Sequence, residues 1–91
     1  MKHRGRLLYN GQIVLDDIRV ALDPQRRGGA WSGRLALPPG ASIQAGGPYD
    51  LVLFDGRTAR VLMRNSAVNF GTVDSVAEFL GAGPIQAALV N

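Results

Sequence analysis

The segment that most constrains the fold is residues 49–63, where two runs of alternating apolar residues flank the dipeptide Asp55-Gly56. An Asp-Gly pair between two such runs is among the strongest short-range signals for a β-hairpin. The register of the hairpin matters, because a shift of one residue turns every side chain to the other face of the sheet. The segment therefore predicts a hairpin whose register can be argued from its side chains.

Two registers fit this hairpin. A two-residue loop would pair Phe54 with Arg57 and would leave both faces with a mixture of apolar and charged side chains. A three-residue loop gives Gly56 the left-handed conformation of a bulged turn and produces one fully apolar face. It also sets Asp50 opposite Arg60, an opposite-charge pair worth roughly 0.2–1 kcal/mol. We expect the three-residue loop, with an inward face of Tyr49, Leu51, Leu53, Ala59, Val61 and Met63.

A second hairpin is predicted near the N-terminus, around the dipeptide Asn10-Gly11. Asn-Gly is typical of two-residue turns with both residues at positive φ, and here it would pair Tyr9 with Gln12. The alternation then breaks at the two aspartates, residues 16–17, which predicts a β-bulge or a bend. In the next strand, one side is expected to face inward: Trp31, Gly33, Leu35 and Leu37.

Residues 75–80 admit two interpretations. Ser75 and Glu78 have the spacing of a helix capping box, and Gly81 follows as a terminator. The same residues alternate as a strand with Ala77 and Phe79 inward, and a helix this short is marginal unless it docks. We expect a strand.

These elements indicate one all-β domain. Several short strands with turn signals about every ten residues are typical of a small barrel or sandwich. We expect about 5–7 mostly antiparallel strands built from hairpins, with at most one short helix near the C-terminus. Residues 1–5 are expected to be flexible and residues 85–91 to form a tail.

The order of three motifs carries a resemblance. The motifs are Trp-Ser-Gly-Arg-Leu at 31–35, Tyr-Asp-Leu-Val-Leu-Phe-Asp-Gly-Arg at 49–57 and Phe-Leu-Gly-Ala-Gly-Pro at 79–84. Together they resemble short bacterial β-proteins without an assigned activity. The resemblance supports a strand at 75–80 and implies no functional residue.

Composition limits how the chain can be stabilised and where in the cell we expect it. With 91 residues the core is small, and without cysteine there is neither a disulfide nor thiolate chemistry. The basic N-terminus is followed by only three apolar residues before a turn, too few for a secretory signal, and no run is long enough to span a membrane. We expect a cytoplasmic protein that does not contact a membrane.

The residues needed for catalysis are scarce. His3 is the only histidine, so a Ser-His-Asp or Cys-His arrangement is not available within one chain. On a regular strand Asp16 and Asp17 would point to opposite faces, and would not form an acid and base pair. We expect no enzymatic activity, no cofactor and no metal.

The basic residues do not form the dense block that is typical of a nucleic-acid patch, and the most plausible anion-binding loop is Arg26-Arg27 with the two glycines that follow. The formal charge is +3, nine of the ten basic residues are arginine, and acidic residues are interspersed among them. Arg26-Arg27 could take the place of the arginines in cyclic-dinucleotide-binding barrels of the PilZ type. The Asp/Asn-x-Ser-x-x-Gly strand motif of those barrels is missing, so we do not expect this ligand.

Two functional hypotheses follow. The first is a non-catalytic module that acts by association with a protein partner or with itself, motivated by open strand edges and by outward Val52 and Leu62. The second is weak binding of nucleic acid or a phosphorylated ligand by an arginine-bearing face, because bases stack on aromatic rings while phosphates pair with cations. The candidate face for a ligand or partner comprises Arg26, Arg27, Phe54, Arg57, Arg60 and Arg64.

Overall fold

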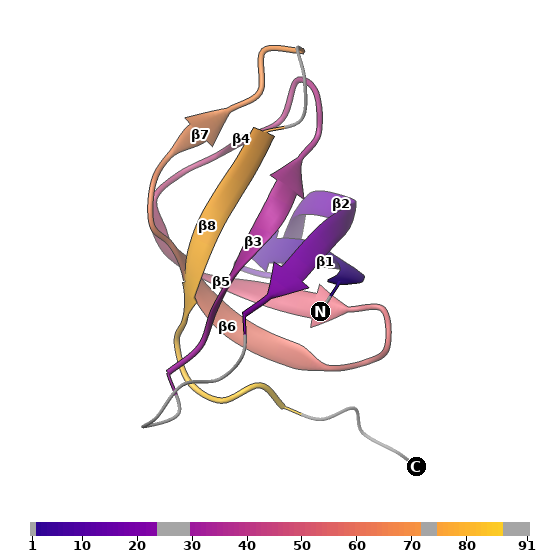
Figure 1. Ribbon diagram of the computed structural model, residues 1–91, viewed down its shortest axis with the longest axis vertical. Coiled ribbons are helices and arrows are strands. Elements are labelled where there is room, and N and C mark those ends of the chain that lie inside the picture. Colours follow the sequence, from indigo (N-terminus) through magenta and orange to yellow (C-terminus); the bar gives the residue numbers. More distant parts are fainter. Residues whose placement is uncertain (1, 24–29, 72–74, 87–91) are drawn as a thin grey trace.

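The computed structural model describes residues 2–23, 30–71 and 75–86, and these residues form eight β-strands and no helix. The strands are β1 (Lys2–Tyr9), β2 (Gln12–Leu22), β3 (Ser32–Leu37), β4 (Ser42–Ile43), β5 (Gly46–Leu53), β6 (Thr58–Met63), β7 (Ala67–Val68) and β8 (Ser75–Gly81). Six of them close into an antiparallel barrel in the order β1-β2-β3-β8-β6-β5, and β4 pairs with β7 (Figure 1). The predicted all-β fold is confirmed, as a barrel. No helix in the described part of the chain could cross a membrane.

The hairpin β5–β6 has the expected register. Tyr49 lies opposite Val61, and the Leu53 amide donates a hydrogen bond of 2.8 Å to the Arg57 carbonyl across the three-residue loop. Gly56 has a φ of 97°, the left-handed conformation that this loop requires. The whole predicted inward face is buried: Tyr49, Leu51, Leu53, Ala59, Val61 and Met63.

The hairpin β1–β2 also turns as predicted. Tyr9 pairs with Gln12, and the turn residues Asn10 and Gly11 have φ values of 52° and 80°. Strand β1 begins at Lys2, so it includes most of the segment that we expected to be flexible. This N-terminal strand pairs with both β2 and β5, and it therefore contributes directly to closing the barrel.

The predicted bulge lies at the two aspartates of β2. Gly5 pairs with Ile18 and Leu7 with Leu15, so one residue of β1 faces two residues of β2. Asp17 has a φ of 49°, a conformation that non-glycine residues adopt rarely and Asp more readily than most. The bulge bends β2 so that its second half can pair with β3.

Strand β8 completes the barrel between β3 and β6. Gly33 of β3 lies opposite Phe79, and Leu62 of β6 lies opposite Leu80. Residues 75–80 thus form a strand, as expected, with Ala77 and Phe79 buried. Each of the six barrel strands has a neighbour on both sides. The expectation of open strand edges therefore does not hold for the barrel, whereas β4 and β7 pair only with each other.

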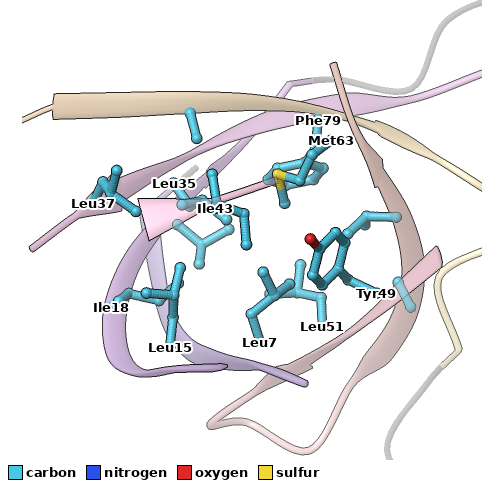
Figure 2. Packing of buried hydrophobic residues seen from close by; sticks show 14 of the residues in the cluster. Leu7, Leu15, Ile18, Leu35, Leu37, Ile43, Tyr49, Leu51, Met63 and Phe79 are labelled. Carbon is cyan, nitrogen blue, oxygen red and sulfur yellow. The ribbon is translucent and has the colours of Figure 1, made fainter. Parts of the chain in front are cut away.

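The buried side chains form one hydrophobic cluster inside the barrel, and Figure 2 shows Leu7, Leu35 and Phe79 among them. At one end, the Trp31 indole Nε1 donates a hydrogen bond of 2.6 Å to the Gly83 carbonyl, and its ring lies edge-on to Phe79 at 6.1 Å between centroids. Near the other end, Tyr49 and Ile43 are buried. The two ends of the barrel therefore differ in what closes them.

One polar residue in the described part of the chain belongs to this interior. Asn69 is 1% exposed, and its side-chain amide donates to the Leu37 carbonyl at 2.8 Å while its Oδ1 accepts from the Gly71 amide at 3.0 Å. Both polar ends of the buried amide are thus satisfied, as burial requires. The contacts tie the segment after β7 to the end of β3.

Candidate functional site

The predicted face follows the length of hairpin β5–β6 instead of forming one cluster. Phe54 and Arg57 lie in its turn, Arg60 lies within β6 and Arg64 directly after it. Phe54 is 51% exposed. The other two predicted residues, Arg26 and Arg27, lie outside the described residues. The structure brings together only the pair in the turn.

Arg57 makes several contacts within the turn and with β1. Its Nε lies 2.9 Å from Asp55 Oδ2, its amide donates to Asp55 Oδ1 at 3.0 Å, and its Nη2 lies 3.1 Å from His3 Nδ1. The backbone hydrogen bond from Arg57 is the main cause that lowers the pKa of Asp55, with partial desolvation acting against it. The guanidinium thus stabilises its own turn and already has anionic and polar partners.

The two arginines further along also have acidic partners. Arg60 Nε lies 3.6 Å from Asp50 Oδ1, which is the cross-strand pair that the register predicts. Arg64 Nη1 lies 3.6 Å from Glu78 Oε2 on β8. These pairs are exposed and individually weak, but each neutralises a positive charge on the face.

Strand β1 adds two arginines to this surface that the sequence analysis did not select. The Arg6 guanidinium lies 5.3 Å from the centroid of the Phe54 ring, a cation–π distance. Its Nε lies 3.3 Å from Asp16 Oδ1, an ion-pair distance without hydrogen-bond alignment. Arg4 Nε donates to Asp17 Oδ1 at 2.7 Å. Alternation along β1 is enough to predict that Arg4 and Arg6 face outward. Their position beside the β5–β6 turn follows only from the pairing of β1 with β5.

The bulge aspartates are engaged by these arginines. The hydrogen bond from Arg4 lowers the pKa of Asp17, and the same hydrogen bond raises the pKa of Arg4. Asp16 Oδ1 also accepts a hydrogen bond of 2.9 Å from the Asp17 amide. The carboxylates of Asp16 and Asp17 therefore both have partners at the bulge, and their contacts stabilise it.

The same pattern extends over the described surface. Every carboxylate that the structure describes forms an ion pair with an arginine: Asp16, Asp17, Asp23, Asp50, Asp55 and Glu78. Within the described ranges, no group of three or more His, Cys, Asp or Glu side chains could bind a metal ion. The charged side chains thus form local pairs distributed around the barrel.

A different surface lies on the outside of β3, β8 and β6. Leu80 is 44% exposed and lies opposite Leu62, which is 40% exposed, and Val76 is 58% exposed opposite Ala36. We call these four residues the apolar outer face. Beside Ala36 and Val76, the surface is hollowed by about 280 Å³.

Only part of this surface was predictable from the sequence. Leu62 is exposed as predicted, whereas Val52, the other residue predicted to face outward, is partly buried. With Ala77 and Phe79 inward, alternation implied that Val76 and Leu80 point outward. The position of Leu80 opposite Leu62 depends on the pairing of β6 with β8, which nothing local in the sequence indicates.

Comparison of the chain with models of known protein families, with curated proteins and with solved structures finds no match in any of the three. The function of the chain is therefore inferred from its own contacts, charges and exposed surfaces.

Proposed function

We propose that this chain is a non-catalytic module that associates with another protein chain through the apolar outer face. The observation that supports this is the direct opposition of Leu62 and Leu80, both at least 40% exposed, on neighbouring strands. Single exposed apolar residues are common on monomers, whereas contiguous ones mark interaction surfaces. Val76, 58% exposed, lies further along the same side of β8, beyond Glu78.

Paired charges lie within this face. The Arg64–Glu78 pair crosses it between Val76 and Leu80, and Arg34, paired with Asp23 at 3.8 Å, lies opposite Glu78 in the same row. The paired charges therefore divide the apolar residues into two groups, Leu62 with Leu80 and Ala36 with Val76, and a partner would cover both groups together with the neutralised pairs between them. Because the barrel strands already have neighbours, the partner would contact side chains and would not add a strand to the sheet.

The test compares Leu80→Lys with Phe70→Lys. Leu80 belongs to the face, whereas Phe70 is 88% exposed and lies outside it, so both changes add a charge at an exposed apolar position. If the partner is a second copy of the chain, we expect light scattering to show a mass that rises with concentration. If the partner is another protein, we expect photo-crosslinking from position 76 to give one defined adduct. Leu80→Lys should abolish either result and Phe70→Lys should preserve it. A monomer at high concentration with no adduct would contradict the proposal.

A second candidate is weak binding of single-stranded nucleic acid at the β5–β6 turn. The observation in its favour is the half-exposed Phe54 ring with Arg6 over it and Arg57 beside it, because such rings stack on bases. The ion pairs of Arg6 and Arg57 weaken the case for nucleic-acid binding, since a phosphate would have to displace a carboxylate from each arginine.

A ten-nucleotide oligothymidine tests this candidate. It should shift the backbone amide resonances of Arg6, Phe54 and Arg57 at low salt, and the shifts should weaken as salt rises. Unchanged resonances at low salt would exclude this site, because phosphate contacts are strongest there.

A further inference from the structure

The turn of hairpin β1–β2 presents the dipeptide Asn10-Gly11 to solvent. Asparagine is chemically labile, because the backbone nitrogen of the next residue can attack its side-chain carbonyl carbon, Cγ. The new N–C bond closes a succinimide ring, and the side-chain nitrogen leaves as ammonia with the proton of the attacking N–H. Water then opens the ring at the side-chain carbonyl to give aspartate, or at the main-chain carbonyl to give isoaspartate.

Both reacting groups are available at this turn. Asn10 is exposed, and its side-chain amide makes no hydrogen bond within the described part of the chain. The Gly11 amide, which would attack, donates no hydrogen bond to a described residue either. Gly11 has no side chain beside the attacking nitrogen, and even a Cβ built there would meet no atom within 4 Å. Neither hydrogen bonding nor crowding therefore opposes ring closure.

The two other asparagines of the described chain lack this combination. Asn69 is 1% exposed, and both ends of its side-chain amide are held by hydrogen bonds, to the Leu37 carbonyl and from the Gly71 amide. Asn65 is exposed, but Ser66 follows it, and the serine Cβ hinders the attacking nitrogen. Of the three, only Asn10 has both an unrestrained amide and an unhindered attacking nitrogen.

The other hairpin turn, Asp55-Gly56, has the same kind of sequence but is restrained. Asp55 Oδ1 accepts a hydrogen bond of 3.0 Å from the Arg57 amide, and Oδ2 accepts one of 2.9 Å from Arg57 Nε. A carboxylate held in this way is a poor target for a nucleophile, since it carries negative charge and cannot rotate freely. The structure thus distinguishes the two turns, which the sequence alone does not.

Isoaspartate at this position would lengthen the main chain itself. The chain would pass through the side-chain Cβ and Cγ, which adds one atom to a loop of two residues. That loop length sets Tyr9 opposite Gln12, so a longer loop cannot keep the same turn. Strand β1 also pairs with β5, so a change at this turn affects a strand that closes the barrel.

We propose that Asn10 is a site of spontaneous deamidation, and that the isoaspartate formed there destabilises the β1–β2 hairpin. The turn shares no residue with the apolar outer face, so either proposal can fail without the other.

The test ages the full chain at mildly alkaline pH, which favours loss of the proton from the attacking nitrogen, and follows it by peptide mapping. Cleavage after arginine places Asn10 in the peptide 7–19 and Asn65 and Asn69 in the peptide that begins at residue 65. We expect peptide 7–19 to gain the mass difference between an amide NH2 and a hydroxyl group. The change should be at least about tenfold faster than at Asn65 or Asn69, a barrier difference of ~1.4 kcal/mol. A methyltransferase specific for isoaspartate should label the same peptide.

Two variants separate the chemistry from its effect on the fold. Asn10→Gly removes the side-chain amide and tolerates the positive φ of the turn, so its peptide 7–19 should keep its mass. Asn10→Asp carries the charge of the product on an ordinary main chain, and its urea midpoint should stay close to that of the unmodified chain. The isoaspartate form, purified by chromatography, should unfold at a lower urea concentration than Asn10→Asp.

Three results would each overturn the proposal. They are an unchanged peptide 7–19 after ageing, modification of Asn65 or Asn69 as fast as that of Asn10, and equal urea midpoints for the isoaspartate form and Asn10→Asp.

Discussion

At the scale of single residues, two glycines set how closely the core side chains approach the barrel wall. A Cβ on Gly33 would lie 2.5 Å from the Phe79 ring, and a Cβ on Gly81 would overlap the Trp31 indole. Neither glycine has a positive φ, so the reason for glycine here is space and not backbone conformation. The Trp31 ring that closes one end of the barrel therefore depends on the absence of a side chain on β8.

Gly81→Ala should destabilise the fold by about 1–3 kcal/mol, the usual cost of overpacking a core. The measurement is urea unfolding followed by the fluorescence of Trp31, the only tryptophan. A double-mutant cycle with Trp31→Leu, followed by circular dichroism, isolates the cause. In the Trp31→Leu background, Gly81→Ala should lower the free energy of unfolding by clearly less than it does in the unmodified chain. An equal cost in both backgrounds would show that the overlap with the indole is not responsible.

At the scale of elements, the turns were predictable because their signals are local. Asn10-Gly11 indicated a two-residue loop, whereas the apolar and charged faces around Asp55-Gly56 decided between two loop lengths, and in both cases the loop length set the register of the hairpin. The bulge at residues 16–17 was predictable for the same reason, since the change of phase lies within one strand. Each of these inferences used one continuous segment, the longest being residues 49–63.

Gly56→Ala tests the register directly. In the three-residue loop Gly56 has a φ of 97°, where a Cβ is strained, so the change should cost about 1–2 kcal/mol. Gly56→Asn should cost less, because asparagine tolerates positive φ better than alanine. Thermal unfolding of both variants gives the comparison. Equal and small costs for the two would contradict a left-handed residue at this position.

At the scale of the whole molecule, the pairings between distant strands were not predictable. The contact of Arg6 with Phe54 depends on β1 lying beside β5, and the contact of Leu62 with Leu80 depends on β8 lying beside β6. Long-range pairing is decided by how all the apolar faces are buried together, which no single segment encodes. Four of the six residues of the predicted face therefore lie in or directly after one hairpin, whereas their neighbours Arg4 and Arg6 from β1 were not predicted.

The ion pairs around the barrel predict acid sensitivity of the whole fold. Asp17 and Asp55 have pKa values below the ordinary 3.8, because Arg4 and Arg57 donate hydrogen bonds to them. The unfolded chain then binds more protons than the folded chain near and below pH 3.8, so stability falls as pH falls. The contribution of Asp17 and Asp55 to the free energy of unfolding is complete above about pH 5, and it is lost as the pH drops through their lowered pKa values.

Asp17→Asn separates this effect from general charge repulsion. At pH 7 the variant should be less stable than the unmodified chain, because the Arg4 hydrogen bond then ends on a neutral amide. Towards pH 2 the difference should shrink, since the unmodified chain loses the same charge by protonation. Urea midpoints measured across this range at constant ionic strength give the two curves. Parallel curves would mean that Asp17 titrates alike in the folded and unfolded chains, and that the bulge pair is not a source of acid sensitivity.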